Sequence, residues 1–256
     1  MIGLRTLEWL VAAALLAAAG SAAAQIQMLV DSTDPDLASE VGKAPNIDGI
    51  DSVADAAAEA GKIPGKRVLI IAGHGLSGMI GMGSGKSPNY IRGKDLSYAH
   101  LSDVSSELAH IAATFAPAPA GQPNLLILCG CSVGAGPNGL SLLTQLSNQF
   151  PNTIVVAPTV MTEVGPWVKG KICAYVAPQA NGIQWRTGWT VAARNGNPVP
   201  VDDALISQIN SAACIPCTSA RRCQPPTGSE RRAAAAAAAA GCADVARSAP
   251  ARRRRG

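Results

Sequence analysis

Two short apolar blocks, each ending in glycine beside a reactive side chain, most constrain how this chain can fold. The first is VLIIAGHG (Val68–Gly75) and the second is LLILCGCS (Leu125–Ser132). Nearly continuous apolar runs that stop in glycine are typical of strands buried on both faces of a parallel sheet. In such sheets chemistry collects where the strands end at their carboxyl edge. We therefore expect two adjacent parallel strands that bring His74 and Cys131 together.

The rest of the chain alternates between strand-like and helix-like segments, which indicates an α/β fold. Strands are predicted over residues 27–30, 67–72, 125–129 and 153–157, and helices over residues 51–60, 102–115, 139–150 and 203–212. A glycine-rich loop or hairpin is expected over residues 75–93, and the sequence RNGN at 194–197 predicts a β-hairpin turn. We expect a doubly wound, mostly parallel sheet with helices on both faces, followed by a C-terminal hairpin.

The first 24 residues have the pattern of an export signal. Arg5 precedes an apolar run from Leu10 to Ala19, and small residues stand immediately before Gln25. This is the order of a secretory signal peptide, and the run is short for a membrane span. We expect residues 1–24 to be removed, leaving a secreted or periplasmic protein without stable membrane insertion. An uncleaved anchor and a soluble Ala-rich helix are the alternatives.

The basic character of the chain belongs to its last segment, residues 221–256. This segment has nine Arg against Glu230 and Asp244, a net charge of +7, whereas the whole chain carries +4. The segment contains a run of eight alanines and few larger apolar side chains that could be buried in a core. It is therefore predicted to be a disordered, low-complexity tail. Such a tail could grip nucleic acid or an anionic surface. We expect no nucleic-acid partner, because no aromatic side chain stands among the arginines to stack on bases. Residues 25–220 remain as the α/β domain.

Of the three histidines, His74 is the best candidate for chemistry. It lies between Gly73 and Gly75 at a strand end, and flanking glycines allow backbone to approach a ligand closely. His110 lies off the apolar face of its predicted helix and is expected to be solvated. His100 comes just before the residue, Ser102, that is predicted to cap that helix.

Cys131 is the candidate nucleophile. It is followed by a small-residue turn leading into a helix, and a thiol near a helix amino end and an imidazole favours the thiolate. Strand alternation places Cys129 on the same face, so periodicity alone does not choose between the two cysteines. The nucleophile must lie past the end of the strand, which favours Cys131 and leaves Cys129 as a small buried residue.

The segments Ile71–Gly75 and Cys129–Ser132 resemble the paired His-Gly and Cys blocks of the caspase-like (clan CD) cysteine peptidases. The sequence Gly130-Cys131-Ser132 is most similar to the self-cleaving cysteine peptidase domain of RTX toxins. The opening LVDS (Leu29–Ser32), followed by Pro35-Asp36-Leu37, also resembles an uncharacterised domain near the start of giant bacterial repeat adhesins. The similarity covers residues 27–165.

The resemblance implies a Cys–His dyad acting on a peptide or protein substrate, with no cofactor and no metal. Cys131 would attack a peptide carbonyl, and His74 would protonate the leaving amine. The oxyanion would be held by the backbone N–H groups of Gly75 and of Cys131 itself. Neither a third orienting residue nor the cleavage specificity can be read from the sequence.

A second hypothesis uses Ser132 as the nucleophile. Gly130–Gly134 fits G-x-S-x-G, the nucleophile elbow of the α/β-hydrolases, which would make the protein an esterase. That fold places its catalytic His after the Ser in the chain, whereas all three histidines here precede Ser132. The hypothesis therefore ranks below the Cys–His dyad.

Two further motifs are misleading. The segment Gly81–Ser87 imitates a phosphate-binding loop, but Ile80 stands where its first glycine belongs and Pro88 where the helix would begin. Cys214 and Cys217 have the spacing of a thioredoxin-like pair but follow a helix rather than a strand. The cysteines expected to form disulfides in an oxidising compartment are Cys173, Cys214, Cys217, Cys223 and Cys242. An odd total of seven is consistent with one cysteine left free for chemistry but does not establish it.

A non-enzymatic role is the main alternative to peptidase activity. Domains of this type can persist as secreted binding or sorting modules after losing activity. The thiol separates the two classes, because a peptidase needs a reactive Cys131 and a binding module does not.

Overall fold

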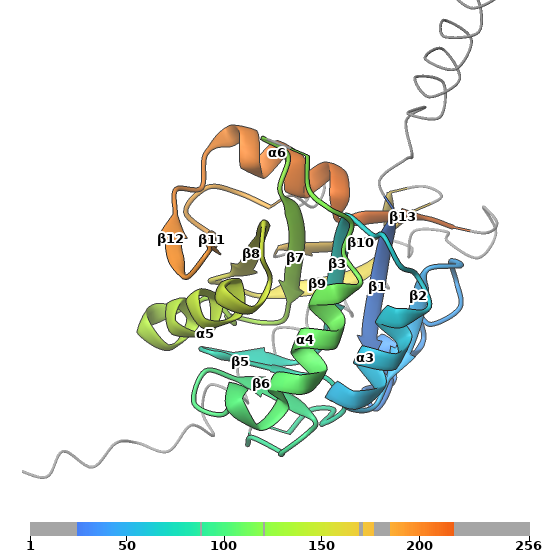
Figure 1. The fold of residues 1–256 in the computed structure, drawn as a ribbon. Coiled ribbons are helices and arrows are strands. Elements are labelled where there is room, and N and C mark those ends of the chain that lie inside the picture. The colour runs from blue at the N-terminus through green and yellow to red at the C-terminus, as the bar shows by residue number, and fades with distance from the viewer. Residues whose placement is uncertain (1–24, 88, 120, 169–170, 177–184, 218–256) are drawn as a thin grey trace, which may run out of the picture.

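The computed structural model describes residues 25–87, 89–119, 121–168, 171–176 and 185–217. Within them, a central seven-stranded sheet has the strand order β12-β11-β8-β7-β3-β1-β2 (Figure 1). Its strands are β1 Ile26–Asp31, β2 Ile47–Ile50, β3 Val68–Ala72, β7 Asn124–Cys129, β8 Thr153–Pro158, β11 Thr190–Arg194 and β12 Asn197–Val199. The five strands from β2 to β8 are parallel, and β11 and β12 add to the β8 edge as an antiparallel hairpin. The mostly parallel α/β sheet and the hairpin are as predicted.

The two apolar blocks form neighbouring strands in the middle of this sheet. Strands β3 and β7 pair in parallel, with Val68 opposite Leu125 and Ala72 opposite Cys129. Every residue of both strands is buried, which explains why neither block alternates with polar residues. The expected pairing of the two strands is therefore confirmed.

Each face of the sheet is covered by a separate layer, and each layer has its own apolar core (Figure 1). One face packs against helices α3 Val53–Gly61, α4 Ser105–Ala113 and α5 Gly136–Gln149. The other packs against helix α6 Asp203–Ala212 and a small antiparallel sheet of β13 Cys214–Pro216, β10 Lys171–Val176 and β9 Thr162–Val168. Alternate residues of one strand enter different cores: Leu69 and Ile71 face the three helices, whereas Val68 and Ile70 face α6.

The helix starts follow ordinary capping rules at α3 and α6 but not at α4. The Ser52 side chain accepts a hydrogen bond from the Asp55 N–H, and Asp202 does the same for Leu205. The prediction that Ser102 caps the next helix is wrong. A 3₁₀ turn, Leu101–Val104, precedes α4 there, and the buried Leu101 and Val104 fix its position.

A third, short antiparallel sheet follows His74, and its first two strands form the hairpin that was one of the two alternatives predicted for residues 75–93. It consists of β4 Gly75–Leu76, β5 Met79–Gly81 and β6 Asp95–Ser97. The sequence analysis missed β2, β9, β10, β13 and the short helix α2 Pro35–Ala38. The elements β2, β13 and α2 are only three or four residues long. Strands β9 and β10 are longer, but β9 contains Gly and Pro and β10 contains Lys, which are depleted in strands.

Lys66 is an unusual part of the core at the opposite end of the sheet from His74. Its side chain is fully buried, and Nζ donates to the Ala60 carbonyl at 2.7 Å and to Thr114 Oγ1 at 2.6 Å. The Phe115 ring centroid lies 6.0 Å from this ammonium. Desolvation lowers the pKa of Lys66 to about 8. The ammonium thus joins the ends of helices α3 and α4, at the cost of burying a charge.

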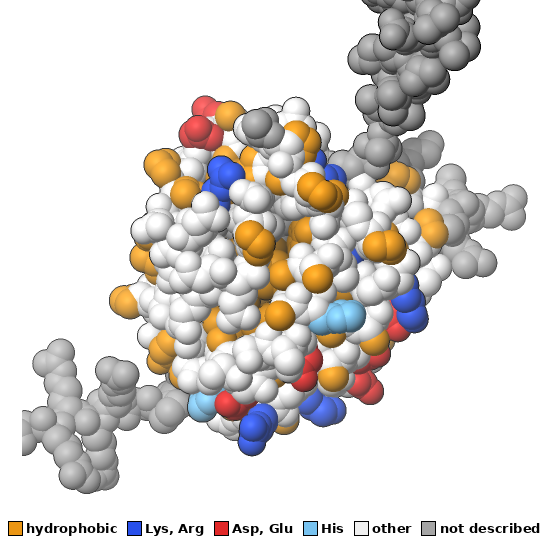
Figure 2. All heavy atoms as spheres, in the orientation of Figure 1, with side chains coloured by type: hydrophobic (Ala, Val, Ile, Leu, Met, Phe, Trp, Pro, Cys, Tyr) orange, Lys and Arg blue, Asp and Glu red, His pale blue; other side chains and the backbone are white. Residues whose placement is uncertain are grey.

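The predicted signal peptide, residues 1–24, and the predicted tail, residues 221–256, lie outside the described residues. Among the residues that are described, no helix combines the length and hydrophobicity needed to cross a membrane. On the face shown in Figure 2, Lys and Arg side chains are scattered among Asp and Glu rather than gathered in one patch.

Candidate active site

The backbones that carry His74 and Cys131 are in direct contact where β3 and β7 end. The Gly73 N–H donates to the Cys129 carbonyl at 3.2 Å. A Cβ atom added to Gly75 would lie 2.8 Å from the Gly130 carbonyl carbon and 3.0 Å from the Cys131 nitrogen. The carboxyl edge therefore brings the two candidate residues onto touching segments of chain, as the sequence predicted.

The glycines on either side of His74 lie against other segments of backbone. A Cβ on Gly73 would collide with the carbonyl of Gly81 on β5, and a Cβ on Gly75 would collide with the turn after β7. The glycines therefore let one backbone segment approach another closely. This packing holds His74 between β5 on one side and the Cys131 turn on the other.

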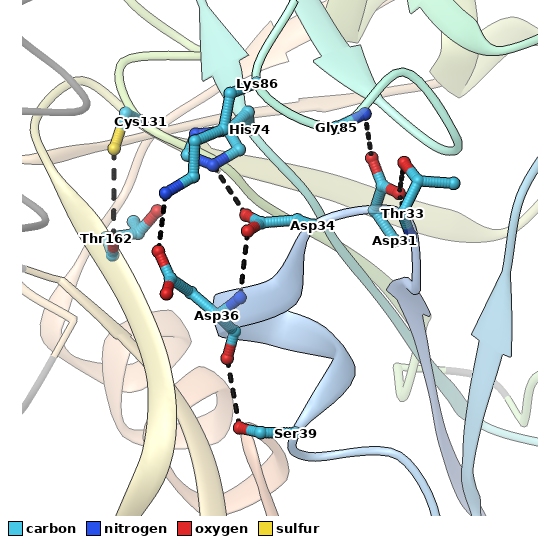
Figure 3. A network of polar contacts seen from close by, with 10 residues as sticks. All are labelled: Asp31, Thr33, Asp34, Asp36, Ser39, His74, Gly85, Lys86, Cys131 and Thr162. Atoms are coloured by element: carbon cyan, nitrogen blue, oxygen red, sulfur yellow. Dashed lines mark hydrogen bonds and ion pairs between the residues drawn. The ribbon is translucent and has the colours of Figure 1, made fainter.

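A carboxylate that the sequence analysis did not identify lies against His74. The Nε2 atom of His74 is 2.5 Å from Oδ2 of Asp34 (Figure 3). Asp34 follows β1, the strand next to β3, and its other carboxylate oxygen accepts from the Asp36 N–H at 3.0 Å as the cap of helix α2. Three neighbouring parallel strands thus each contribute one residue to the same sheet edge. Polar residues after the first predicted strand were the available signal, but positions 31–36 hold five of them (Asp31, Ser32, Thr33, Asp34 and Asp36), and the sequence alone does not choose between them.

The charge of Asp34 is stabilised although its side chain is only 1% exposed. Burial alone would raise the pKa of this carboxyl, but the polar contact and charge of His74 outweigh it and the pKa is lowered. The Asp36 N–H and the ammonium of Lys86 act in the same direction. Nε2 is thus the ring nitrogen of His74 that faces Asp34.

Cys131 lies in a tight turn directly after β7. The next residue, Ser132, has a φ of 57°, a left-handed conformation that is uncommon for a residue other than glycine. The Ser132 N–H donates to the Val160 carbonyl at 2.9 Å, which fixes the turn. Backbone strain of this kind is often found at functional sites.

Strand β9 passes over both cysteines. The Sγ atom of Cys131 lies 3.9 Å from the Thr162 carbonyl oxygen, and Sγ of Cys129 lies 3.7 Å from the Glu163 carbonyl oxygen (Figure 3 shows the former). Cys131 is 8% exposed and Cys129 is 2% exposed. The two sulfurs therefore face the same side, as alternation predicted, and β9 covers them.

The disulfides differ from the expectation in one important respect. Cys173 on β10 is bonded to Cys214 on β13, so Cys214 is not paired with Cys217 as in a thioredoxin-like motif. Cys131 and Cys217 are each disulfide-bonded as well, and Cys129 is the described cysteine that is in no disulfide. Cys131 was not among the cysteines expected to form disulfides, and in this state of the protein it is bonded. Cys223 and Cys242 lie outside the described residues.

The backbone around Gly75 suits an oxyanion site. Gly75 pairs with Ile80 on β5, and the Gly81 N–H donates to the His74 carbonyl at 2.7 Å. Hydrogen-bonded and non-hydrogen-bonded pairs alternate in antiparallel strands, so the Gly75 N–H points away from β5. An ideal Cβ on Gly75 would lie 3.0 Å from the Cys131 nitrogen, so the two residues whose N–H groups the resemblance implies as donors are in close contact.

The phosphate-loop imitation is bound by carboxylates of the protein itself. The Gly85 N–H donates to Asp31 Oδ2 at 3.0 Å, and Lys86 Nζ lies 2.6 Å from Asp36 Oδ2 (Figure 3). Asp31 is fully buried, and Thr33 donates to its other oxygen through its N–H at 3.0 Å and its hydroxyl at 2.6 Å. Rejecting the motif as a phosphate site is therefore consistent with its contacts, which attach this loop to the end of β1.

The remaining candidates lie apart from this arrangement. His100 stacks on Tyr90 with ring centroids 4.1 Å apart, and His110 is exposed as predicted. Within the described ranges, no group of three or more His, Cys, Asp or Glu side chains is placed to hold a metal ion.

Comparison with known proteins adds no assignment. No family model, no curated protein and no solved structure matches the chain.

Proposed function

We propose that the protein is a cysteine peptidase, exported and of the caspase-like type, in which His74 and Cys131 form the catalytic dyad. The observation that carries the proposal is the contact between the ends of β3 and β7, which places a histidine and a cysteine at the carboxyl edge of a parallel sheet. The motif resemblance and the position of Gly75 support it. The Cys173–Cys214 disulfide is compatible with an extracellular location.

In the proposed reaction the Cys131 thiolate attacks the carbonyl carbon of a peptide bond. Negative charge develops on the carbonyl oxygen, and the N–H groups of Gly75 and Cys131 stabilise it. His74 donates a proton to the leaving amine, and the C–N bond breaks to give an acyl-enzyme. Water, deprotonated by His74, then releases the acyl group and regenerates the thiol. Because a disulfide sulfur cannot attack, the proposed active form has a reduced Cys131.

An inactive binding or sorting module on the same fold is the second candidate. Two observations favour it: the low exposure of Cys131 and the position of β9 across its sulfur. A substrate reaches Cys131 only if β9 moves or if the peptide binds along it. The esterase hypothesis based on Ser132 ranks third.

The test is peptide hydrolysis by the reduced protein lacking residues 1–24, measured on a mixture of fluorogenic peptides. Hydrolysis should fall at least about 100-fold in Cys131→Ala and in His74→Ala, the size expected when a nucleophile or a general acid is removed. Cys129→Ala and Ser132→Ala are the matched controls and should remain active. If no variant, including the wild type, cleaves any peptide, the binding module is favoured. Loss of activity in Ser132→Ala but not in Cys131→Ala would favour the esterase.

A further inference from the structure

We propose that Asp34 is the positioning residue of the proposed site, holding the imidazole of His74 in the tautomer and orientation that leave Nδ1 for the reaction. The inference rests on the proposed function for its catalytic consequence, but the pairing itself is a separate claim about the fold. In the view of Figure 3, the imidazole lies between Cys131 and Asp34.

Burial and anchoring distinguish Asp34 from an ordinary surface carboxylate. Only 1% of its side chain is exposed, and a buried carboxylate needs a charged or hydrogen-bonding partner. Its two oxygens have different partners: one accepts from the Asp36 N–H and the other lies 2.5 Å from His74 Nε2. The first contact fixes the carboxylate to the turn after β1, and the second transmits that fixed position to the ring.

The neighbouring acidic residues do not share this arrangement. Asp31 is occupied by Thr33 and Gly85, and Asp36 is exposed and paired with Lys86. Of the carboxylates at the end of β1, Asp34 is thus the one in contact with His74. A carboxylate on one ring nitrogen stabilises the imidazolium that forms when the other nitrogen takes a proton, as in other catalytic triads.

Asp34→Asn separates this role from helix capping, because Asn caps a helix as well as Asp does. The thermal midpoint should therefore change little, whereas Asp34→Ala should lower it through loss of the cap. Asp36→Asn is the matched control, since it removes a nearby carboxylate that contacts Lys86 instead of His74.

The first readout is ¹⁵N NMR of the His74 ring at a pH where the ring is neutral. The wild type should show a protonated Nε2 and a bare Nδ1, and Asp34→Asn should shift this tautomer balance while Asp36→Asn should not. An unchanged ring spectrum in Asp34→Asn would overturn the proposal.

The second readout is kcat/KM of the reduced enzyme across pH. Asp34→Asn should lower kcat by about 100-fold or more with a small change in KM, by analogy with the triad aspartate. A loss of less than about threefold would refute a positioning role in catalysis, since one well-placed group is worth more than that. If the wild type hydrolyses nothing, the proposed function fails, and the ring spectrum still decides the Asp34–His74 pairing.

Discussion

Ala72 and Cys129 stand directly opposite each other on the parallel strands β3 and β7, and this register aligns the ends of the two strands. His74 and Cys131 each come two residues after this pair. A shift of one residue in the register would turn every side chain of one strand to the other face. The apolar cores on both sides of the sheet therefore determine where the candidate catalytic residues lie.

Gly75→Ala should destabilise the protein and damage the site together. The new Cβ would lie 2.8 Å from the Gly130 carbonyl carbon, which is too close for backbone that cannot move aside. We expect a loss of about 1–3 kcal/mol in the free energy of unfolding, the usual cost of overpacking, measured by urea denaturation. In the control, Gly61→Ala at the end of α3, the nearest atom is His110 Nε2 at 3.5 Å. This change should be neutral or slightly stabilising, and equal effects at both positions would contradict the close approach at Gly75.

Lys66→Met should stabilise the protein at neutral pH. The pKa of Lys66 is lowered to about 8 by burial, against about 10.4 in an unfolded chain, so the folded state binds this proton less tightly. Below pH 8, burying the Lys66 charge destabilises the folded state to the full extent. This destabilisation declines as the pH rises from 8 to 10.4, because Lys66 loses its proton in the folded state before it does so in the unfolded state. By this reasoning, the free energy of unfolding of the Met variant should exceed that of the wild type by up to about 3 kcal/mol at pH 7.

The gain from Lys66→Met should shrink toward pH 10, which denaturation of both proteins over this range can measure. Lys62→Met is the control, because that ammonium is exposed and paired with Glu59. A gain that is the same at pH 7 and pH 10 would show that Lys66 is not strained by desolvation.

Removing the Cys173–Cys214 disulfide should weaken the layer over the site without removing a proposed catalytic group. The bond closes a loop with a sequence separation of 41 residues and joins β10 to β13. Replacing both cysteines with Ala should cost about 2–4 kcal/mol of unfolding free energy, the usual value for such a loop. Thermal unfolding with and without reductant measures this loss. Reductant breaks the Cys173–Cys214 bond in the wild type and should lower its thermal midpoint, whereas the variant has no such bond to lose. A variant as stable as the oxidised wild type would contradict a stapling role.

The central sheet was predictable because its signals are local and strong. The apolar blocks of β3, β7 and β8, the amphipathic helices α3 and α5, and the Asn195-Gly196 turn each identify an element without tertiary information. The carboxyl-edge rule then placed His74 and Cys131 just after the ends of two neighbouring strands.

Other features depend on contacts between distant segments, which no local pattern reveals. The contact of Asp34 with His74 requires that β1 lie beside β3, and the cover over Cys131 comes from β9, about 30 residues further along the chain. The disulfide partners are likewise set by the fold, since cysteine spacing alone does not determine connectivity.

The most direct test of the account is the rate at which iodoacetamide labels Cys131 near pH 6.5, after reduction, in the wild type and in His74→Ala. A dyad favours the thiolate, so Cys131 should be labelled faster than Cys129, and His74→Ala should slow that labelling as the thiol pKa returns toward about 8.5. Slow, equal labelling of both cysteines regardless of His74 would contradict the dyad and identify a protein that keeps the fold without the chemistry.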